Sequence, residues 1–221
     1  MKNTPITTFS NTDPIWEYFK QAESLSEHQL QQFKIYAQLL CSWNDRMNLT
    51  AITNLDEIIK FHFQDSLILT KVHSLTESVG LIDVGTGAGF PAIPLKIIYP
   101  SLPLVLIEVN QKKRSFLAHV IQILGLTDIV ISDLDWRTFI RNSDYTADIV
   151  CARASLRPDE LLRMFKGASH YQSATLVYWA AQDWQPEGHE QRFFEKEYAY
   201  QTGQKKRKLI FFKNTMSSSA Q

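Results

Sequence analysis

The sequence has little cysteine, no excess of charge of either sign and no long apolar run. Its two cysteines, Cys41 and Cys151, lie far apart among 221 residues, so we expect neither a disulfide framework nor a cysteine metal site. Lys plus Arg and Asp plus Glu each number 23, and this balance gives no support for a nucleic-acid partner, although a local basic patch stays open. No apolar stretch approaches the ~20 residues that span a membrane. The N-terminal MKNTPITTFS lacks a signal-peptide core, and we expect a cytoplasmic protein without metal or membrane contact.

Apolar residues make up 44% of the chain, which is enough for a folded core. The first third reads as helical. The stretch SEHQLQQFKIYAQLLCSWNDRM repeats apolar residues at helical spacing, and Ser26 with Gln29 resembles a capping box. NLTAIT interrupts this pattern, and LDEIIKFHFQDSLILTKV predicts one further helix. We interpret residues 1–75 as a helical N-terminal extension that packs on the core.

From about Val79, short β-rich runs alternate with helical ones. The predicted strands are VGLIDV, PLVLIEV, DIVIS, ADIVCA, ATLVYWA and RKLIFFK. Because the strands are apolar nearly throughout, they predict a mostly parallel sheet that is covered on both faces. The fold class is therefore α/β, doubly wound, over residues 76–215, and we expect residues 216–221 to form a disordered tail.

The glycine-rich stretch LIDVGTGAGFPAIPLKI, residues 81–97, has the pattern D-x-G-x-G-x-G. Gly85 begins the turn after a strand, where glycine permits positive φ and close approach of a ligand. In a doubly wound sheet this first turn is a ligand crevice. The dinucleotide pattern G-x-G-x-x-G is not met, because Phe90 stands where its third glycine would be. Phe90 and Pro91 also crowd the helix start where a pyrophosphate would bind.

An acid ends the next strand at Glu108, 23 positions after Gly85. An acidic residue about 20 positions beyond such a loop can accept both hydroxyls of a ribose. The loop and the acid together favour a ribose-bearing ligand without a pyrophosphate, a description that S-adenosylmethionine (SAM) fits. The alternative is a tight strand–helix turn with no ligand, for which a single glycine would suffice.

Several stretches resemble one protein family in both order and spacing. WNDRMNLTAIT, HFQDSL, DVGTGAGFPAIPL, EVNQKKRSFL and ARASL, between residues 30 and 165, are similar to the bacterial 16S rRNA (guanine-N7) methyltransferases, also called glucose-inhibited division protein B. The resemblance implies a Rossmann-like, SAM-dependent enzyme with a helical N-terminal extension. It also implies methylation of a guanine in the decoding region, with 16S rRNA or the 30S subunit as partner. We expect a monomer.

The resemblance also implies which residues contact the cofactor. They are Asp83, Gly85, Thr86, Gly87, Gly89, Phe90, Glu108, Leu134, Asp135 and Arg153. Glu108 corresponds to the ribose acid of the family, and Leu134 with Asp135 corresponds to its pair near the adenine. Arg153 corresponds to the arginine at the junction of the cofactor and substrate sites.

Methylation of guanine N7 needs no general base, because N7 already offers a lone pair. The enzyme must align N7, the methyl carbon and sulfur, and hold the base out of its stack. We therefore expect no catalytic dyad, and we predict that His62, Asp65 and Arg153 position the substrate. In the alternative interpretation, His62 and Asp65 form a hydrogen-bonded polar flank of a packed helix. Arg153 would then belong to a surface ion pair.

Four residues are predicted to contact RNA. Asn48 lies in the NLTAIT stretch, and Lys112, Arg114 and Lys206 lie in the clusters QKKR and QKKRK. Lysine and arginine are the usual phosphate contacts of RNA enzymes. The alternatives are a turn or cap residue for Asn48 and solvated faces for the basic clusters.

Two departures from the family pattern remove positive charge. A lysine of the family corresponds to Ala181 or Gln182, and Asp133 stands where the family has a basic residue. A different methyl acceptor, and a SAM-binding module without catalysis, therefore stay open as alternatives. A nicotinamide oxidoreductase is the least favoured, because the dinucleotide spacing is missing.

Overall fold

A seven-stranded sheet forms the centre of the protein. The computed structural model describes residues 13–167 and 169–214, and the predicted tail 216–221 lies outside these ranges. The strand order is β3-β2-β1-β4-β5-β7-β6. The strands are β1 (Leu81–Val84), β2 (Leu104–Ile107), β3 (Ile129–Ser132), β4 (Ile149–Arg153), β5 (Thr175–Ala181), β6 (Phe194–Thr202) and β7 (Lys205–Phe212). β1 to β5 are parallel and β7 is antiparallel to both neighbours, which confirms the α/β doubly wound fold.

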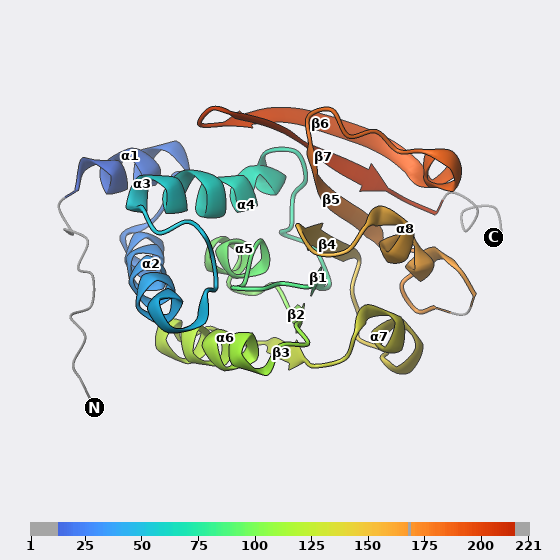
Figure 1. Cartoon of the computed structure of the whole chain (residues 1–221), viewed down its shortest axis with the longest axis horizontal. Coiled ribbons are helices and arrows are strands. Elements are labelled where there is room, and N and C mark those ends of the chain that lie inside the picture. Colours follow the sequence, from blue (N-terminus) through green and yellow to red (C-terminus); the bar gives the residue numbers. More distant parts are fainter. Residues whose placement is uncertain (1–12, 168, 215–221) are drawn as a thin grey trace.

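Helices cover both faces of this sheet (Figure 1). One face packs with α1 (Pro14–Ala22), α2 (Glu27–Met47), α5 (Ala92–Ile98) and α6 (Gln111–Leu124), and the other with α7 (Trp136–Asn142) and α8 (Pro158–Leu161). Along β1, Leu81 joins the first apolar cluster, and Ile82 and Val84 join the second, as the period-2 alternation of a strand requires. The helices before residue 75 share the first cluster with the sheet, and the domain boundary at that residue stays a prediction.

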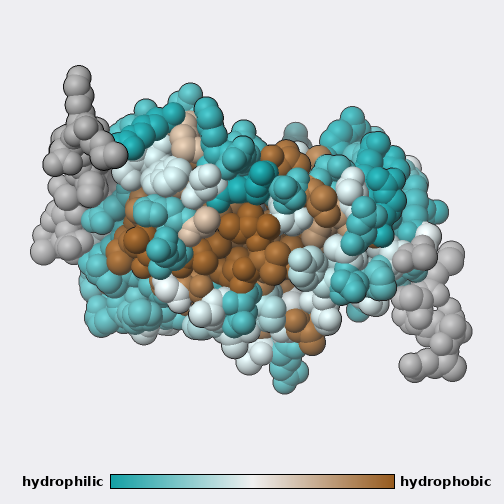
Figure 2. All heavy atoms as spheres, turned by 90° about the horizontal axis from the view of Figure 1, so that it is seen from below, coloured by the Kyte–Doolittle hydropathy of each residue, from teal (hydrophilic) through white to brown (hydrophobic). Residues whose placement is uncertain are grey.

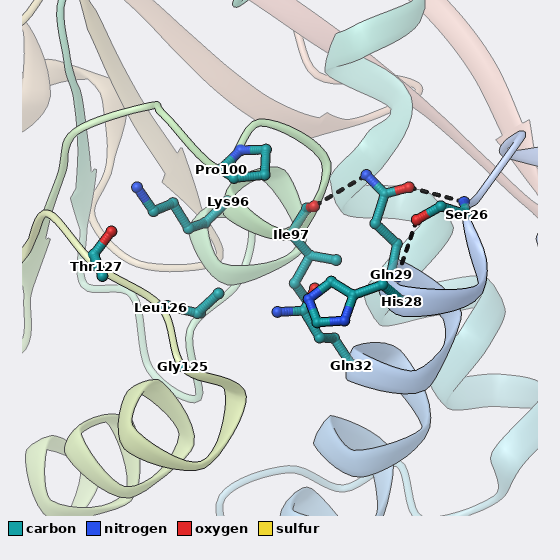
Figure 3. Close-up of a pocket in the computed structure, with 10 residues that line it drawn as sticks. All are labelled: Ser26, His28, Gln29, Gln32, Lys96, Ile97, Pro100, Gly125, Leu126 and Thr127. Carbon is teal, nitrogen blue, oxygen red and sulfur yellow. Dashed lines mark hydrogen bonds between the residues drawn. The ribbon is translucent and has the colours of Figure 1, made fainter.

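The predicted capping box at the start of α2 is present. Ser26 Oγ accepts from N of Gln29 at 3.2 Å, and the Gln29 side chain accepts from N of Ser26 at 2.9 Å. Nε2 of Gln29 also donates to O of Ile97 near the end of α5, and Nε2 of Gln32 donates to O of Leu124 at the end of α6. These bonds satisfy carbonyls that helix ends leave unpaired. Figure 3 shows Gln29 and Gln32 beside a pocket of about 240 Å³, whose lining residues include no predicted site residue.

The single helix predicted from LDEIIKFHFQDSLILTKV is wrong in detail. The segment is divided into α3 (Leu55–Ile58), the π-helical η1 (Ile59–Gln64), α4 (Asp65–Leu67) and the 3₁₀ turn η2 (Ile68–Lys71). A π-turn adds a residue to the helical repeat and commonly marks a functional position. Here it carries His62 and is followed directly by the buried Asp65, whose side chain bonds to residues on the sheet.

The edges of the sheet depart most from the sequence pattern. β6 was not predicted, because most side chains of FEKEYAYQT are exposed and give little apolar signal at this edge. β3 forms the opposite edge, and Val130 within it is 38% exposed. Figure 2 views the side of the molecule where α6 and β3 lie, and it shows apolar side chains gathered across the centre of that face. Within the described ranges, no helix combines the length and apolarity needed to cross a bilayer.

Candidate functional site

The glycine loop follows β1 at the carboxyl end of the sheet. Gly85 has φ +67°, and a Cβ on it would lie 2.6 Å from Cβ of Ser155. Thr86 is buried and donates through Oγ1 to Oδ2 of Asp83 at 2.6 Å, and N of Ala92 donates to the same oxygen at 3.2 Å. Asp83 is fully buried, and this burial raises the pKa of its carboxyl to about 6. Asp83 therefore fixes the glycine loop through its bonds to Thr86 and Ala92.

Glu108 joins the glycine loop to the next helix. Its Oε2 accepts from N of Gly87 at 3.0 Å, and its Oε1 accepts from N of Asn110 at 2.9 Å. Asn110 is the N-cap of α6. The carboxylate is 6% exposed, and each oxygen keeps a lone pair beyond the bond it already accepts. Glu108 can therefore hold the loop and still accept hydroxyl groups from a ligand.

A pocket of about 350 Å³ opens beside these two residues, which is within the range of small-molecule sites. It is lined by Val84, Gly85, Ile107, Glu108, Val109, Lys113, Asp135, Trp136, Ala154, Ser155 and Leu156. The carboxyl ends of β1, β2 and β4 supply most of this wall, and such ends are where doubly wound sheets bind ligands. The residues fit a ribose-bearing ligand, because a buried acid, a bare glycine backbone and an indole converge there.

Three predicted cofactor residues line this pocket: Gly85, Glu108 and Asp135. Asp135 is also the N-cap of α7, and its carboxylate accepts from N and Oγ1 of Thr138. The remaining predicted residues, Asp83, Thr86, Gly87, Gly89, Phe90, Leu134 and Arg153, are not in its lining. Leu134 instead packs against the apolar cluster on the α7 side.

Phe90 is buried between two aromatic rings from the N-terminal helices. His62 stacks on it at a centroid distance of 4.4 Å and an interplanar angle of 7°, and Tyr36 stacks on it at 5.3 Å and 26°. Tyr36 also donates its hydroxyl to O of Ala88 in the glycine loop. The loop is therefore fixed by the helical segment, and this contact brings His62 next to the cofactor side of the sheet.

Arg153 connects His62 with Asp65. Its Nη1 donates to Oδ2 of Asp65 at 2.7 Å and to O of Phe61 at 3.0 Å, and its Nη2 lies 3.2 Å from Nδ1 of His62. The Arg153 side chain is 9% exposed, so the alternative of a surface ion pair is wrong. The alternative hydrogen bond between His62 and Asp65 is also wrong, since Arg153 bridges the two. The structure thus brings together the three residues predicted to position the substrate.

The contacts of His62 determine its tautomer. Arginine only donates, so Nδ1 of His62 must accept, and the proton lies on Nε2, 2.9 Å from Oγ1 of Thr50. Burial and the neighbouring cations, Arg153 first among them, lower the pKa of His62 to about 3. His62 is therefore a neutral ring near pH 7 and cannot serve as a general acid there.

Asp65 is further held by residues that the sequence did not single out. Tyr200 on β6 donates its hydroxyl to Oδ1 at 2.8 Å, and Nε1 of Trp179 on β5 donates to O of Asp65 at 2.8 Å. Arg207 on β7 lies 3.6 Å from Oδ2. These partners come from distant strands, and the two aromatic ones are buried, at 4% exposed for Trp179 and 9% for Tyr200. No local pattern in the sequence links them to Asp65.

The four residues predicted to contact RNA lie in different settings. Asn48 is the left-handed C-cap of α2 with φ 49°, as its turn alternative requires, and Lys112 is exposed in the first turn of α6. Arg114 donates to O of Glu108 at 3.0 Å and to O of Val109 at 2.7 Å, so it holds the backbone beside the pocket. Lys206 is exposed near the turn of the β6–β7 hairpin, within a strand that begins earlier than expected, at Lys205. Their role in RNA binding stays a prediction.

Both charge-removing positions lie on the surface. Ala181 is the exposed last residue of β5, and Asp133 is exposed between β3 and α7.

No group of three or more His, Cys, Asp or Glu side chains that could hold a metal ion occurs among residues 13–167 and 169–214.

Comparisons with a family profile and with individual proteins point to the same family. The profile described as rRNA small subunit methyltransferase G (GidB) matches residues 29–213. A ribosomal RNA small subunit methyltransferase G from Chloroflexus aggregans is 48% identical over 132 residues, covering 59% of this chain and 55% of that protein. One from Geobacillus is 43% identical over 136 residues, covering 61% and 57%. The matched stretch thus spans little more than half the length of these curated relatives.

The solved structures agree on the fold. A SAM-dependent methyltransferase from Aquifex aeolicus superposes with a TM-score of 0.54 at 16% identity, covering 75% of this chain and 97% of that one. At this identity the likeness shows a shared α/β fold.

Proposed function

Because the chain belongs to the rRNA small subunit methyltransferase G family, we propose that it transfers a methyl group from SAM to N7 of a guanine in 16S rRNA. The observation that carries the proposal is that the glycine loop contacts both the pocket, through the bond of Gly87 to Glu108, and the His62–Arg153–Asp65 cluster, through the stack of Phe90 on His62. One side suits the ribose of a methyl donor, and the other offers fixed donors and a flat ring to a base.

The cofactor assignment is supported by the chemistry of the pocket. Glu108 would accept the ribose hydroxyls, and the backbone at Gly85 would allow close approach because no Cβ fits there. Trp136 and Asp135 would border the adenine. When bound, SAM supplies an electrophilic methyl carbon. We propose the remaining loop residues, Asp83, Thr86, Gly87, Gly89 and Phe90, as supports of this site, and Leu134 as packing beneath it.

The catalytic task is one of alignment. N7 of guanine attacks with its own lone pair, so no group of the protein must remove a proton. The proposed role of Arg153 is to hold the ring of His62 and the backbone at Phe61 in place, so that the base is received by an ordered surface. Asp65 acts through Arg153 and is a positioning residue. The neutral state of His62 agrees with a reaction that uses no acid or base.

On the RNA side we propose contacts from Asn48, Lys112 and the basic β6–β7 turn with 16S rRNA, either free or within the 30S subunit, and a cytoplasmic monomer as the active form. Arg114 contributes less, because its guanidinium is engaged by two carbonyls.

The test is methyl transfer with the purified protein. We would incubate it with labelled SAM and 30S particles or 16S rRNA from a strain that lacks this activity, and map 7-methylguanosine by mass spectrometry. Appearance of the modification in one decoding-region fragment is the expected result. SAM binding by calorimetry without methyl transfer would instead support a non-catalytic module, and methylation of another RNA would change the acceptor.

A further inference from the structure

The turn of the β6–β7 hairpin lies against the π-helical segment that carries His62. Thr202 pairs directly with Lys205, and Gly203 between them has φ +57°, as the first position of a II′ turn requires. A Cβ on Gly203 would lie 3.2 Å from Cε1 of Phe61, so the turn touches this ring. Figure 1 shows the end of the hairpin reaching over the segment between α3 and α4.

Lys205 faces the same side as the His62 cluster. Its Nζ lies 4.2 Å from the ring centroid of Phe61. Side chains alternate along a strand, so Lys205 and Arg207 share one face of β7, and Arg207 on that face approaches Asp65 at 3.6 Å. Lys206 points to the opposite face, together with Lys208. The residue nearest the reaction side is therefore Lys205, although the sequence pattern favoured Lys206.

Positive charge exceeds negative charge on this face. Asp65 already pairs with Arg153 at 2.7 Å and also serves Arg207. Lys205 has no carboxylate within ion-pair distance among the residues that the structure describes, and its cationic head is held on an aromatic ring. One buried carboxylate thus serves two arginines, and Lys205 on the ring of Phe61 adds a further positive charge that can neutralise an incoming anion.

We propose that Lys205, held on Phe61, contacts a backbone phosphate of the RNA strand beside the target guanine. This inference rests on the proposed function, because it assumes an RNA acceptor at the His62–Arg153 side. A cation that is ordered by a ring contact loses less freedom when a phosphate binds than a fully mobile lysine would. Phosphate contacts of this kind set the register of a nucleic acid without reading its sequence.

The chain offers a closely matched control. Lys196 on β6 is exposed, stands on the same face of the hairpin and lies 4.9 Å from the ring centroid of Phe211. Lys196 pairs in register with Phe211. Phe211 lies six residues along β7 from Lys205, which corresponds to about 20 Å of strand. Lys196→Glu and Lys205→Glu therefore make the same change of charge in the same kind of contact at opposite ends of one hairpin.

The experiment measures binding of a 16S rRNA fragment and of 30S particles between about 50 and 200 mM salt, together with SAM affinity and thermal stability. A plot of log affinity against log salt has a negative slope, and Lys205→Ala should make this slope less steep by about 1. Lys205→Glu should weaken RNA binding about three- to ten-fold, as expected when one phosphate is no longer neutralised, and leave SAM affinity unchanged. Lys205→Arg should restore binding, and Lys196→Glu should have a smaller effect than Lys205→Glu.

Equal RNA affinity and equal salt slopes for Lys205→Glu and Lys196→Glu would overturn the assignment of Lys205. Failure of the proposed function looks different, because wild-type protein would then bind SAM and transfer no methyl to either substrate. Lys205→Ala removes an exposed side chain together with its contact to the ring of Phe61, so an unchanged melting temperature shows that the fold is intact and that the binding result is decisive.

Discussion

Arg153 and Asp65 form an ion pair in the interior, with Nη1 and Oδ2 2.7 Å apart and the two side chains 9% and 1% exposed. The pair joins the end of β4 to α4, and through Phe61 and His62 it also fixes the π-helical segment. A buried charge that loses its partner keeps its desolvation cost, and this makes the pair a sensitive point of the fold.

Removing the charge of Asp65 should destabilise the protein strongly. For Asp65→Asn we expect a loss of about 3–5 kcal/mol in the free energy of unfolding, measured by urea denaturation, because Arg153 is then buried without its carboxylate. Asp56→Asn is the control: Lys60 and Asp56 are also 2.7 Å apart, but their side chains are 34% and 47% exposed, and such pairs contribute about 0–1 kcal/mol. Equal losses in the two variants would contradict a role for burial.

His62 should make stability depend on pH. Its folded pKa of about 3 lies below the ordinary value of 6.5. Between these two values the unfolded chain binds a proton at His62 that the folded chain does not bind. The contribution of neutral His62 to the free energy of unfolding is therefore complete above pH 6.5 and is lost as the pH falls toward 3. Relative to His62→Phe, which keeps the ring on Phe90, wild-type protein should lose up to about 1.4 kcal/mol for each pH unit below 6.5.

The measurement is a series of denaturant titrations between pH 7.5 and 4.5 in ~0.5-unit steps, which begins above the ordinary pKa of histidine and covers the upper part of the interval between the two pKa values. The exposed His189, changed to Asn, provides the histidine control. Parallel pH profiles for wild-type protein and His62→Phe would show that His62 is protonated in the folded state as readily as in the unfolded one.

The glycine loop and the strands next to it could be predicted because their signals are local. Gly85, the acid at Glu108 and the capping box at Ser26 each depend on residues within one turn or one strand. The bonding of Asp65 could not be predicted, since its partners Tyr200 and Trp179 lie 135 and 114 positions away. β6 could not be predicted because an exposed edge strand needs no apolar alternation. The π-turn could not be predicted because its apolar spacing resembles that of an α-helix.

Glu108 should contribute both to the shape of the loop and to the affinity for SAM. Glu108→Ala removes the acceptor of N of Gly87 and N of Asn110 together with the proposed ribose contact. We expect SAM affinity to fall by about 1–3 kcal/mol, as measured by calorimetry. Glu108→Gln keeps one acceptor oxygen and should lose less. Unchanged affinity in Glu108→Ala would mean that the ligand does not reach this carboxylate.

Gly85→Ala should abolish SAM binding for a steric reason. The new Cβ would lie 2.6 Å from Cβ of Ser155, which also lines the pocket, at a residue with φ +67°. Gly125→Ala is the matched control, because Gly125 has φ +63° and no heavy atom within 4 Å of the added Cβ. Both variants carry the left-handed penalty of about 1–2 kcal/mol, so both melting temperatures should fall. Only Gly85→Ala should lose SAM in calorimetry, because only there does the side chain displace a wall of the pocket. Equal SAM affinity in the two variants would separate the pocket at Ser155 from the cofactor, and the ligand would then have to be sought at another face of the sheet.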